Sequence, residues 1–289
     1  MSVSEIFRKA YEELEKGYRI ALITIIGKEG SGPRDLGSMI LVSSSGLKIG
    51  TIGGGFFEKT VLEETRKALE EGRPRRVKYA LRPDNVPEDA IKTPHLCGGV
   101  VEVFINVINP VPRIILFGAG NIGKPLADLA NMLGYRVVVL DTNEELANKE
   151  RYPYAEEIYV GDLVDYAGKI SYRGNDIAII AYGEVETDYQ ILKTLLQNNF
   201  PGHIWALCSR RRCSWMLNRL IEEKIDLCPY IEKLHLPAGL NINSDSPEEI
   251  AVSIFAEIIC VLKKCETPVE SMDISSKWWD SIKNRVEQP

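Results

Sequence analysis

The stretch Phe117-Gly-Ala-Gly-Asn-Ile-Gly123 decides the fold of this chain. Its glycines have the spacing GxGxxG, and the stretch follows an apolar strand-like run and opens a helical pattern. The motif requires that context: Gly118 permits a tight turn, Gly120 lets the backbone approach a pyrophosphate, and Gly123 lets helix and strand pack closely. The start of the helix offers free N–H groups to phosphate.

The residues around this turn alternate between strand-like and helical patterns. Strands are predicted at 113–117, 136–140, 157–160, 176–181 and 203–207, and helices at 120–133, 188–197 and 213–223. This alternation predicts a parallel sheet with helices on both faces, a Rossmann-like doubly wound domain over residues 110–265. Its last helix begins at Ser246-Pro-Glu-Glu249, which has the pattern of a capping box with proline in the first turn.

Asp141 follows the next strand, about 20 residues after the glycine turn, where an acid would hold a ribose hydroxyl. An acid there favours NAD over NADP, because it would repel a 2′-phosphate. Two alternatives stay open: a Rossmann domain without a nucleotide, and one that binds another phosphate ligand. No histidine, lysine or Tyr-x-x-x-Lys arrangement stands out as the proton relay of a dehydrogenase.

Residues 1–109 form a smaller α+β unit. Helices are predicted at 2–17 and 56–71, a hairpin at 38–42 and 47–51, further strands at 19–26, 77–81 and 100–107, and a loop at 82–94. Asn109-Pro-Val-Pro112 separates this unit from the Rossmann-like domain, and residues 266–289 are a tail.

Glycine-rich turns of the first unit have no simple packing explanation. One is Gly30-Ser-Gly-Pro-Arg34 followed by Gly37, and another is Gly50-Thr-Ile-Gly-Gly-Gly55 followed by Glu58. Gly53, Gly54 and Gly55 can expose backbone amides as an anion nest. Arg34 is either a solvated side chain or an anion-binding fork. Glu58 either caps the following helix or holds a ligand amine.

A third glycine turn contains a cysteine, in His95-Leu-Cys97-Gly-Gly99. Nearby amides and His95 would favour a thiolate at Cys97, which makes it a candidate catalytic thiol or soft-metal contact. The alternative is a structural cysteine.

Composition excludes several classes of protein. The 289 residues carry a net charge of −6, which gives no general attraction to nucleic acid or to an anionic membrane. No apolar run suits a signal peptide or a membrane span, so we expect a cytoplasmic protein whose six cysteines are reduced. Three scattered histidines and no CxxC pair predict no metal site.

The three N-terminal turns, with Cys97-Gly-Gly99 continuing to Val103-Phe-Ile105, resemble the signatures of the XdhC/CoxI family. The Rossmann-like unit and Pro237-Ala-Gly-Leu-Asn-Ile-Asn243 resemble the C-terminal half of that family. Its members are accessory proteins of xanthine dehydrogenase and related molybdenum hydroxylases.

The resemblance implies a maturation chaperone rather than a turnover enzyme. Such a protein would bind molybdenum cofactor (molybdopterin), assist its sulfuration, and insert it into a xanthine dehydrogenase-like hydroxylase. The expected partners are that hydroxylase and a cysteine desulfurase, and the expected assembly is a homodimer. Arg34 and Gly53–Gly55 would hold anionic parts of the cofactor, with Cys97 near the metal or sulfur. A cleft between Gly53–Gly55 and Gly118–Gly123 is the expected shared site.

The chain departs from the family pattern at two turns. Where the family has Thr-His followed by Asp, this chain has Ala181-Tyr182-Gly-Glu184 and Thr187-Asp188, without the histidine. Where a Gly-Ser-Arg turn is expected, Cys208 replaces glycine before Ser209-Arg210. Ser209 and Arg210 could still bind phosphate at a helix start, or could form a solvated basic turn.

Two other functions remain open. An NAD-dependent oxidoreductase would use Gly118–Gly123 and Asp141 but leave the N-terminal glycine turns unused. A nucleotide- or redox-sensing regulatory module would use the Rossmann-like half as sensor and the first unit as a partner surface.

Overall fold

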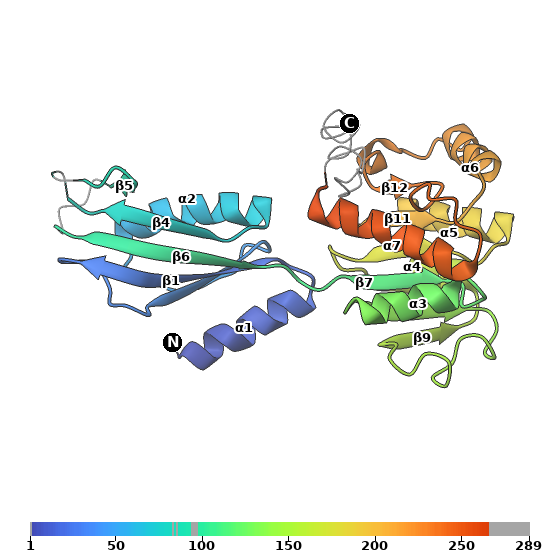
Figure 1. Cartoon of the computed structure of the whole chain (residues 1–289), viewed down its shortest axis with the longest axis horizontal. Coiled ribbons are helices and arrows are strands. Elements are labelled where there is room, and N and C mark those ends of the chain that lie inside the picture. Colours follow the sequence, from blue (N-terminus) through green and yellow to red (C-terminus); the bar gives the residue numbers. More distant parts are fainter. Residues whose placement is uncertain (1, 83, 85, 94–97, 266–289) are drawn as a thin grey trace, which may run out of the picture.

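The computed structural model describes residues 2–265 except 83, 85 and 94–97 (Figure 1). It contains two six-stranded sheets, with strand orders β3-β2-β1-β6-β4-β5 and β12-β11-β10-β7-β8-β9. The chain passes from the first sheet to the second between β6 (Val100–Ile108) and β7 (Arg113–Phe117), through the proline-containing stretch that begins at Asn109. No helix in the described part of the chain is long and apolar enough to cross a membrane.

The first sheet is mostly antiparallel and is covered by one helix on each face (Figure 1). Its elements are α1 (Val3–Glu15), β1 (Ile20–Glu29), β2 (Met39–Ser43), β3 (Lys48–Gly50), α2 (Gly55–Glu71), β4 (Arg75–Ala80) and β5 (Ala90–Lys92), with β6. The predicted hairpin is confirmed as β2 and β3. The predicted loop at 82–94 is wrong at β5, which pairs parallel with β4 through backbone bonds that need no alternating side-chain pattern.

The apolar faces of this unit explain the two helices. Phe57, Val61, Ala68 and Leu69 of α2 pack on the inner residues of β1, β4 and β6. Ile6 and Ala10 of α1 pack on the opposite face, against Ile20, Leu22 and Leu41. The helix-period spacing of these residues places them on one side of each helix.

The second sheet is parallel throughout, which confirms the Rossmann-like prediction. Its elements after β7 are α3 (Gly123–Met132), β8 (Arg136–Asp141), β9 (Glu157–Val160), α4 (Leu163–Lys169), β10 (Ile177–Ile180), α5 (Val185–Gln197), β11 (His203–Ala206), α6 (Arg210–Glu222), the 3-10 helix η1 (Cys228–Tyr230), β12 (Leu234–His235) and α7 (Pro247–Lys263). Helices α3 and α7 cover one face, and α4, α5 and α6 cover the other. The capping box predicted at Ser246 is present.

The glycine turns of the two units lie at opposite ends of the molecule. In the first unit, β1 ends, α2 begins and β6 begins at the end remote from the link to β7 (Figure 1). In the second unit, β7 runs away from the link, so Gly118 lies beyond its far end (Figure 1). The expected cleft between Gly53–Gly55 and Gly118–Gly123 is therefore wrong within one chain.

Candidate functional site

The three glycine-rich turns of the first unit meet at the outer end of its sheet. A Cβ atom at Gly53 would lie closer than 3.0 Å to the side chain of Pro33. A Cβ atom at Gly99 would lie equally close to the carbonyl oxygens of Glu29 and Ser31. Only glycine allows this approach, so the sequence signatures at 30–37, 50–58 and 97–99 build one surface.

Each turn also has a glycine whose Cβ position is open. Nothing lies within 4 Å of the Cβ positions of Gly37, Gly54 and Gly98. All three have positive φ angles of +82°, +71° and +83°, which disfavour any other residue. The surface thus exposes bare backbone from each signature, and a flat ligand can approach that backbone closely.

Glu58 holds the Gly53–Gly55 turn from inside. Its carboxylate accepts hydrogen bonds from Thr51 Oγ1 (2.6 Å), Ile52 N (3.2 Å) and Gly54 N (3.2 Å), and pairs with Lys48. Burial alone would raise its pKa, but Lys48, Thr51 and the two amides outweigh burial and lower the pKa to about 2. Glu58 is therefore a structural carboxylate, and a role in holding a ligand amine is not supported by its contacts.

The same contacts correct the predicted anion nest. The N–H of Gly54 donates to Glu58 and the N–H of Gly53 donates to Thr51 Oγ1 at 3.2 Å. These two amides are used within the chain, so neither is free for an external anion. A positive group for an anion comes instead from Arg34, which is exposed and takes part in none of the ion pairs found among the described residues. Cys97 and His95 lie outside the described residues.

The Gly118–Gly123 turn matches the geometry expected of its motif. Gly118 has φ +110°, and a Cβ there would lie 2.6 Å from the Ala181 carbonyl. A Cβ at Gly120 would meet nothing within 4 Å. The backbone hydrogen bonds described at this turn do not use the N–H groups of Gly120, Asn121 or Ile122. The turn can therefore accept a phosphate group close to Gly120.

Asp141 is buried beneath this turn rather than extended toward solvent. Its Oδ2 accepts from Ala119 N at 2.7 Å, and its Oδ1 accepts from Asn143 N at 2.9 Å. Both oxygens thus shape the glycine turn, and the residue is 3% exposed. A contact with ribose would use lone pairs that these bonds leave over.

Tyr182 stands where the family histidine was expected, next to the same turn. Its hydroxyl and the Thr142 hydroxyl are 3.1 Å apart, which links the loops after β8 and β10. Beneath it, Asp188 accepts from Gly183 N at 3.1 Å and is buried. Burial raises the pKa of Asp188 to about 6, and the backbone bonds only partly oppose that effect.

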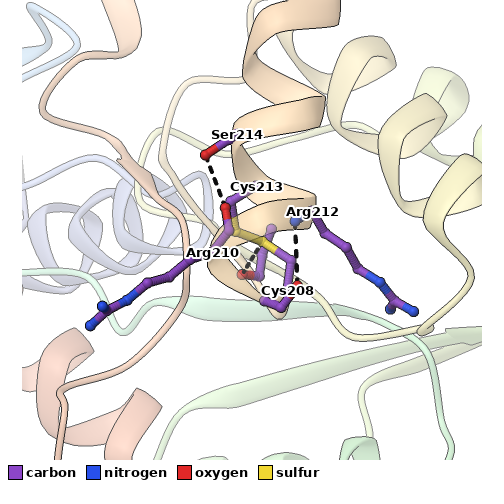
Figure 2. The surroundings of a disulfide bond; sticks show 7 residues. Cys208, Arg210, Arg212, Cys213 and Ser214 are labelled. Atoms are coloured by element: carbon purple, nitrogen blue, oxygen red, sulfur yellow. Dashed lines mark hydrogen bonds between the residues drawn. A yellow bond between two sulfur atoms is a disulfide. The ribbon is translucent and has the colours of Figure 1, made fainter.

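The turn after β11 contains a disulfide between Cys208 and Cys213 (Figure 2). The expectation that all cysteines are reduced is wrong for this pair, because the turn into α6 brings their Cα atoms to 5.8 Å. Ser209 caps α6 by accepting from Arg212 N at 3.3 Å, and Arg210 is exposed. Cys260 lies in α7, whereas Cys265 follows the end of that helix.

The sequence did not predict a histidine pair at the edge of the second sheet. His203 Nδ1 lies 3.2 Å from His235 Nε2, and His235 Nδ1 lies 3.5 Å from Glu257 Oε1. Burial first, then His235 and Lys233, lower the pKa of His203 to about 4. Pairing of β11 with β12 creates this contact, and a strand of two residues has no detectable pattern. The described residues contain no group of three or more side chains that could hold a metal ion.

Comparison with known families gives two matches. Residues 114–258 match a family model described as the XdhC Rossmann domain, and residues 13–80 match one described as the XdhC and CoxI family. Together the two models include both glycine-turn regions except for the third N-terminal signature.

Two curated relatives share 33% identity with the chain. The uncharacterized protein YqeB of Escherichia coli aligns over 257 residues, which is 89% of this chain and 46% of the relative. A protein of Bacillus subtilis described as a probable component of xanthine dehydrogenase aligns over 162 residues, 56% of this chain and 46% of the relative. The chain therefore spans about half the length of the curated relatives it matches.

Among solved structures, one described as a xanthine dehydrogenase from Bacillus halodurans is similar to this chain. It shares 23% identity, has a TM-score of 0.49, and covers 91% of this chain and 97% of its own. A short-chain dehydrogenase/reductase from Vibrio parahaemolyticus matches 50% of this chain and 91% of its own, with 12% identity and a TM-score of 0.35.

Proposed function

The chain belongs to the XdhC and CoxI family, and from that premise we propose that it is an accessory factor of a xanthine dehydrogenase-type molybdenum hydroxylase. In this role it binds molybdenum cofactor, assists its sulfuration and delivers it to the hydroxylase. The cofactor is the cargo of the protein, and the chain acts as a chaperone. A cysteine desulfurase is the proposed sulfur donor, and a homodimer is the proposed assembly.

One observation carries this proposal: the three glycine signatures converge on one surface at the outer end of the first sheet. The open Cβ positions of Gly37, Gly54 and Gly98 would let the flat pterin lie against bare backbone. Arg34 is the nearby cation for its phosphate, through charge-assisted bonds of guanidinium to phosphate. Glu58, neutralised by Lys48, keeps the second turn in shape.

Distance between the two ends of the molecule favours separate roles for the two units. The first unit would hold the cofactor, while the carboxyl edge of the second sheet would bind another phosphate-containing ligand. NAD or another nucleotide is supported there by the open position at Gly120 and the unused amides of Gly120 to Ile122. Nucleotide binding at that edge is our second candidate function, either for regulation or for an oxidoreductase activity.

Activation of the target enzyme tests the accessory role. The purified chain, molybdenum cofactor, a cysteine desulfurase with cysteine, and apo-xanthine dehydrogenase would be combined anaerobically. We expect hydroxylase activity to appear faster with the chain than without it, and Gly53→Val to abolish that gain. Equal activation with and without the wild-type chain would contradict the accessory role.

Calorimetry with NAD tests the second candidate. Gly120→Val would fill the open position and should abolish NAD binding, while Gly46→Val, in the hairpin turn of the first unit, should leave it unchanged. Absence of NAD binding by the wild-type chain would remove NAD as the ligand.

A further inference from the structure

The Cys208–Cys213 disulfide joins the end of β11 to the first turn of α6 (Figure 2). Parallel pairing of β11 with β10, and of β10 with β7, places this turn on the same sheet edge as Gly118. That edge is where doubly wound sheets bind ligands. The bond closes a loop with a sequence separation of only 5, so it removes little conformational freedom from the unfolded chain.

The two sulfur-bearing residues differ in accessibility. Cys213 is 3% exposed, below the first turn of α6, whereas Cys208 is half-buried and reaches the surface of the turn. Thiol–disulfide exchange requires a thiolate to attack one of the two sulfurs. An external thiolate therefore reaches Cys208, and Cys213 becomes the leaving thiolate.

The surroundings of the pair stabilise negative charge on sulfur. The first turn of α6 contains no acidic residue and carries Arg210, Arg211 and Arg212, all exposed. None of these arginines takes part in the ion pairs found among the described residues. Figure 2 shows the side chains of Arg210 and Arg212 extending to opposite sides of the disulfide. The start of a helix and nearby arginines both favour a thiolate over a thiol.

We propose that Cys208 and Cys213 form a redox-active dithiol that carries one sulfane sulfur, with Cys208 as the acceptor and Cys213 as the resolving thiol. This inference rests on the proposed function, since it assigns to the second unit a step in sulfur supply for the cofactor. It gives a role to the cysteine that stands where the family turn has glycine.

The steps balance in atoms and electrons. The Cys208 thiolate attacks the outer sulfur of a donor persulfide, R–S–SH, and the donor leaves as R–S⁻, which yields Cys208–S–SH. The Cys213 thiolate then attacks Cys208 Sγ, the bond to the outer sulfur breaks, and HS⁻ leaves. The two thiolates have together supplied two electrons, and the product is the disulfide seen in the structure. A small dithiol reductant restores the reduced pair and is itself oxidised to a disulfide.

Other cysteines of the chain provide matched controls. Cys228 is exposed and free, and Cys265 is also exposed and free. Neither lies in the first turn of a helix that begins with three arginines. If general thiol exposure were enough to take up sulfur, these residues would react as readily as Cys208.

The test uses the full chain with inorganic polysulfide as the sulfur donor. The protein is reduced in its native state with dithiothreitol, desalted anaerobically and mixed with sodium tetrasulfide, and peptides are mapped by mass spectrometry while released sulfide is measured. We expect wild type to release about one sulfide per chain and to re-form the disulfide. Cys213→Ser should retain one added sulfur on Cys208, Cys208→Ser should release none, and Cys228→Ser should match wild type.

Three results would overturn the relay. They are a disulfide that is reduced only when the protein unfolds, equal sulfur uptake at Cys208, Cys228 and Cys265, and sulfide release by Cys208→Ser at the wild-type level. Molybdenum cofactor retention, measured separately by gel filtration, distinguishes this failure from failure of the proposed function. Cys208→Ser should retain as much cofactor as wild type. Sulfide release by a wild-type chain that retains no cofactor would support the relay and contradict the chaperone role.

Discussion

Pro33 lies so close to Gly53 that no side chain fits between them. A Cβ at Gly53 would come closer than 3.0 Å to the Pro33 ring, and the φ angle of Gly53 is +136°. This contact joins the first glycine signature to the second, and it places Arg34 beside the Gly53–Gly55 turn.

Gly53→Ala should therefore lower the free energy of unfolding by about 2–4 kcal/mol, since it adds overpacking to backbone strain. Gly46→Ala is the matched control, because its φ is +94° but its Cβ position is open. Its cost should be limited to the strain, about 1–2 kcal/mol. Urea unfolding of both variants measures the difference, and equal costs would show that the Pro33 contact is not rigid.

Glu58 makes stability depend on pH in the acid range. Its pKa is lowered to about 2 in the folded chain, so its contribution is complete above the ordinary value of 4.5 and is lost as pH falls toward 2. Glu58→Gln should remove on the order of 2 kcal/mol at pH 7, because Lys48 is 45% exposed and partly screened. Glu63→Gln, on the exposed face of α2, should change stability little. A Glu58→Gln variant that keeps the wild-type acid dependence would exclude this carboxylate as its source.

Asp188 should have the opposite effect. Burial raises its pKa to about 6 from 3.8, so its stabilising contribution is complete below pH 3.8 and is lost as pH rises through 6. Asp188→Asn should thus raise the free energy of unfolding at pH 7.5, by up to about 3 kcal/mol, with a much smaller effect at pH 4. Glu222→Gln on the surface of α6 provides the control. Destabilisation of Asp188→Asn at both pH values would mean that the ionised form is needed to hold Gly183.

Arg113 and Asp176 should be the most sensitive ion pair of the second unit. Their side chains are 5% and 0% exposed, and Arg113 donates to Asp176 from Nε (2.9 Å) and Nη2 (2.7 Å). Arg113→Ala leaves a buried carboxylate without its partner and should cost about 3–5 kcal/mol. Arg136→Ala, which removes a more exposed arginine paired with Glu15 and Glu156, should cost about 1 kcal/mol. Similar unfolding midpoints for the two variants would contradict this ranking.

Patterns that repeat along the sequence predicted most of the fold. The alternation of apolar strands and amphipathic helices, the glycine turn at 118–123 and the capping box at Ser246 each specify a local structure from local residues. Family signatures identified the turns at 30–37 and 50–58, and the structure brings them together. Strand β5 and strand β12 were missed because they are held by backbone pairing at sheet edges.

Details of the candidate site depended on contacts that no local pattern encodes. Glu58 turns back onto the amides of its own turn, and Asp141 turns under Ala119, because both acids meet backbone N–H groups within reach. The Cys208–Cys213 bond depends on how β11 enters α6. Residue types at these turns are readable from the sequence, but which of their atoms remain free is decided by the folded chain.

Cofactor retention by the first unit's glycine surface is the most direct test of the account. The chain would be mixed anaerobically with molybdenum cofactor and passed over a gel-filtration column, and the molybdenum that elutes with protein would be measured. We predict that wild type retains the cofactor, that Arg34→Ala weakens binding at least about tenfold through loss of a charge-assisted bond, and that Arg66→Ala on the exposed side of α2 binds as wild type does. Wild-type protein that elutes without molybdenum, or an Arg34→Ala variant that binds as tightly as wild type, would contradict the account.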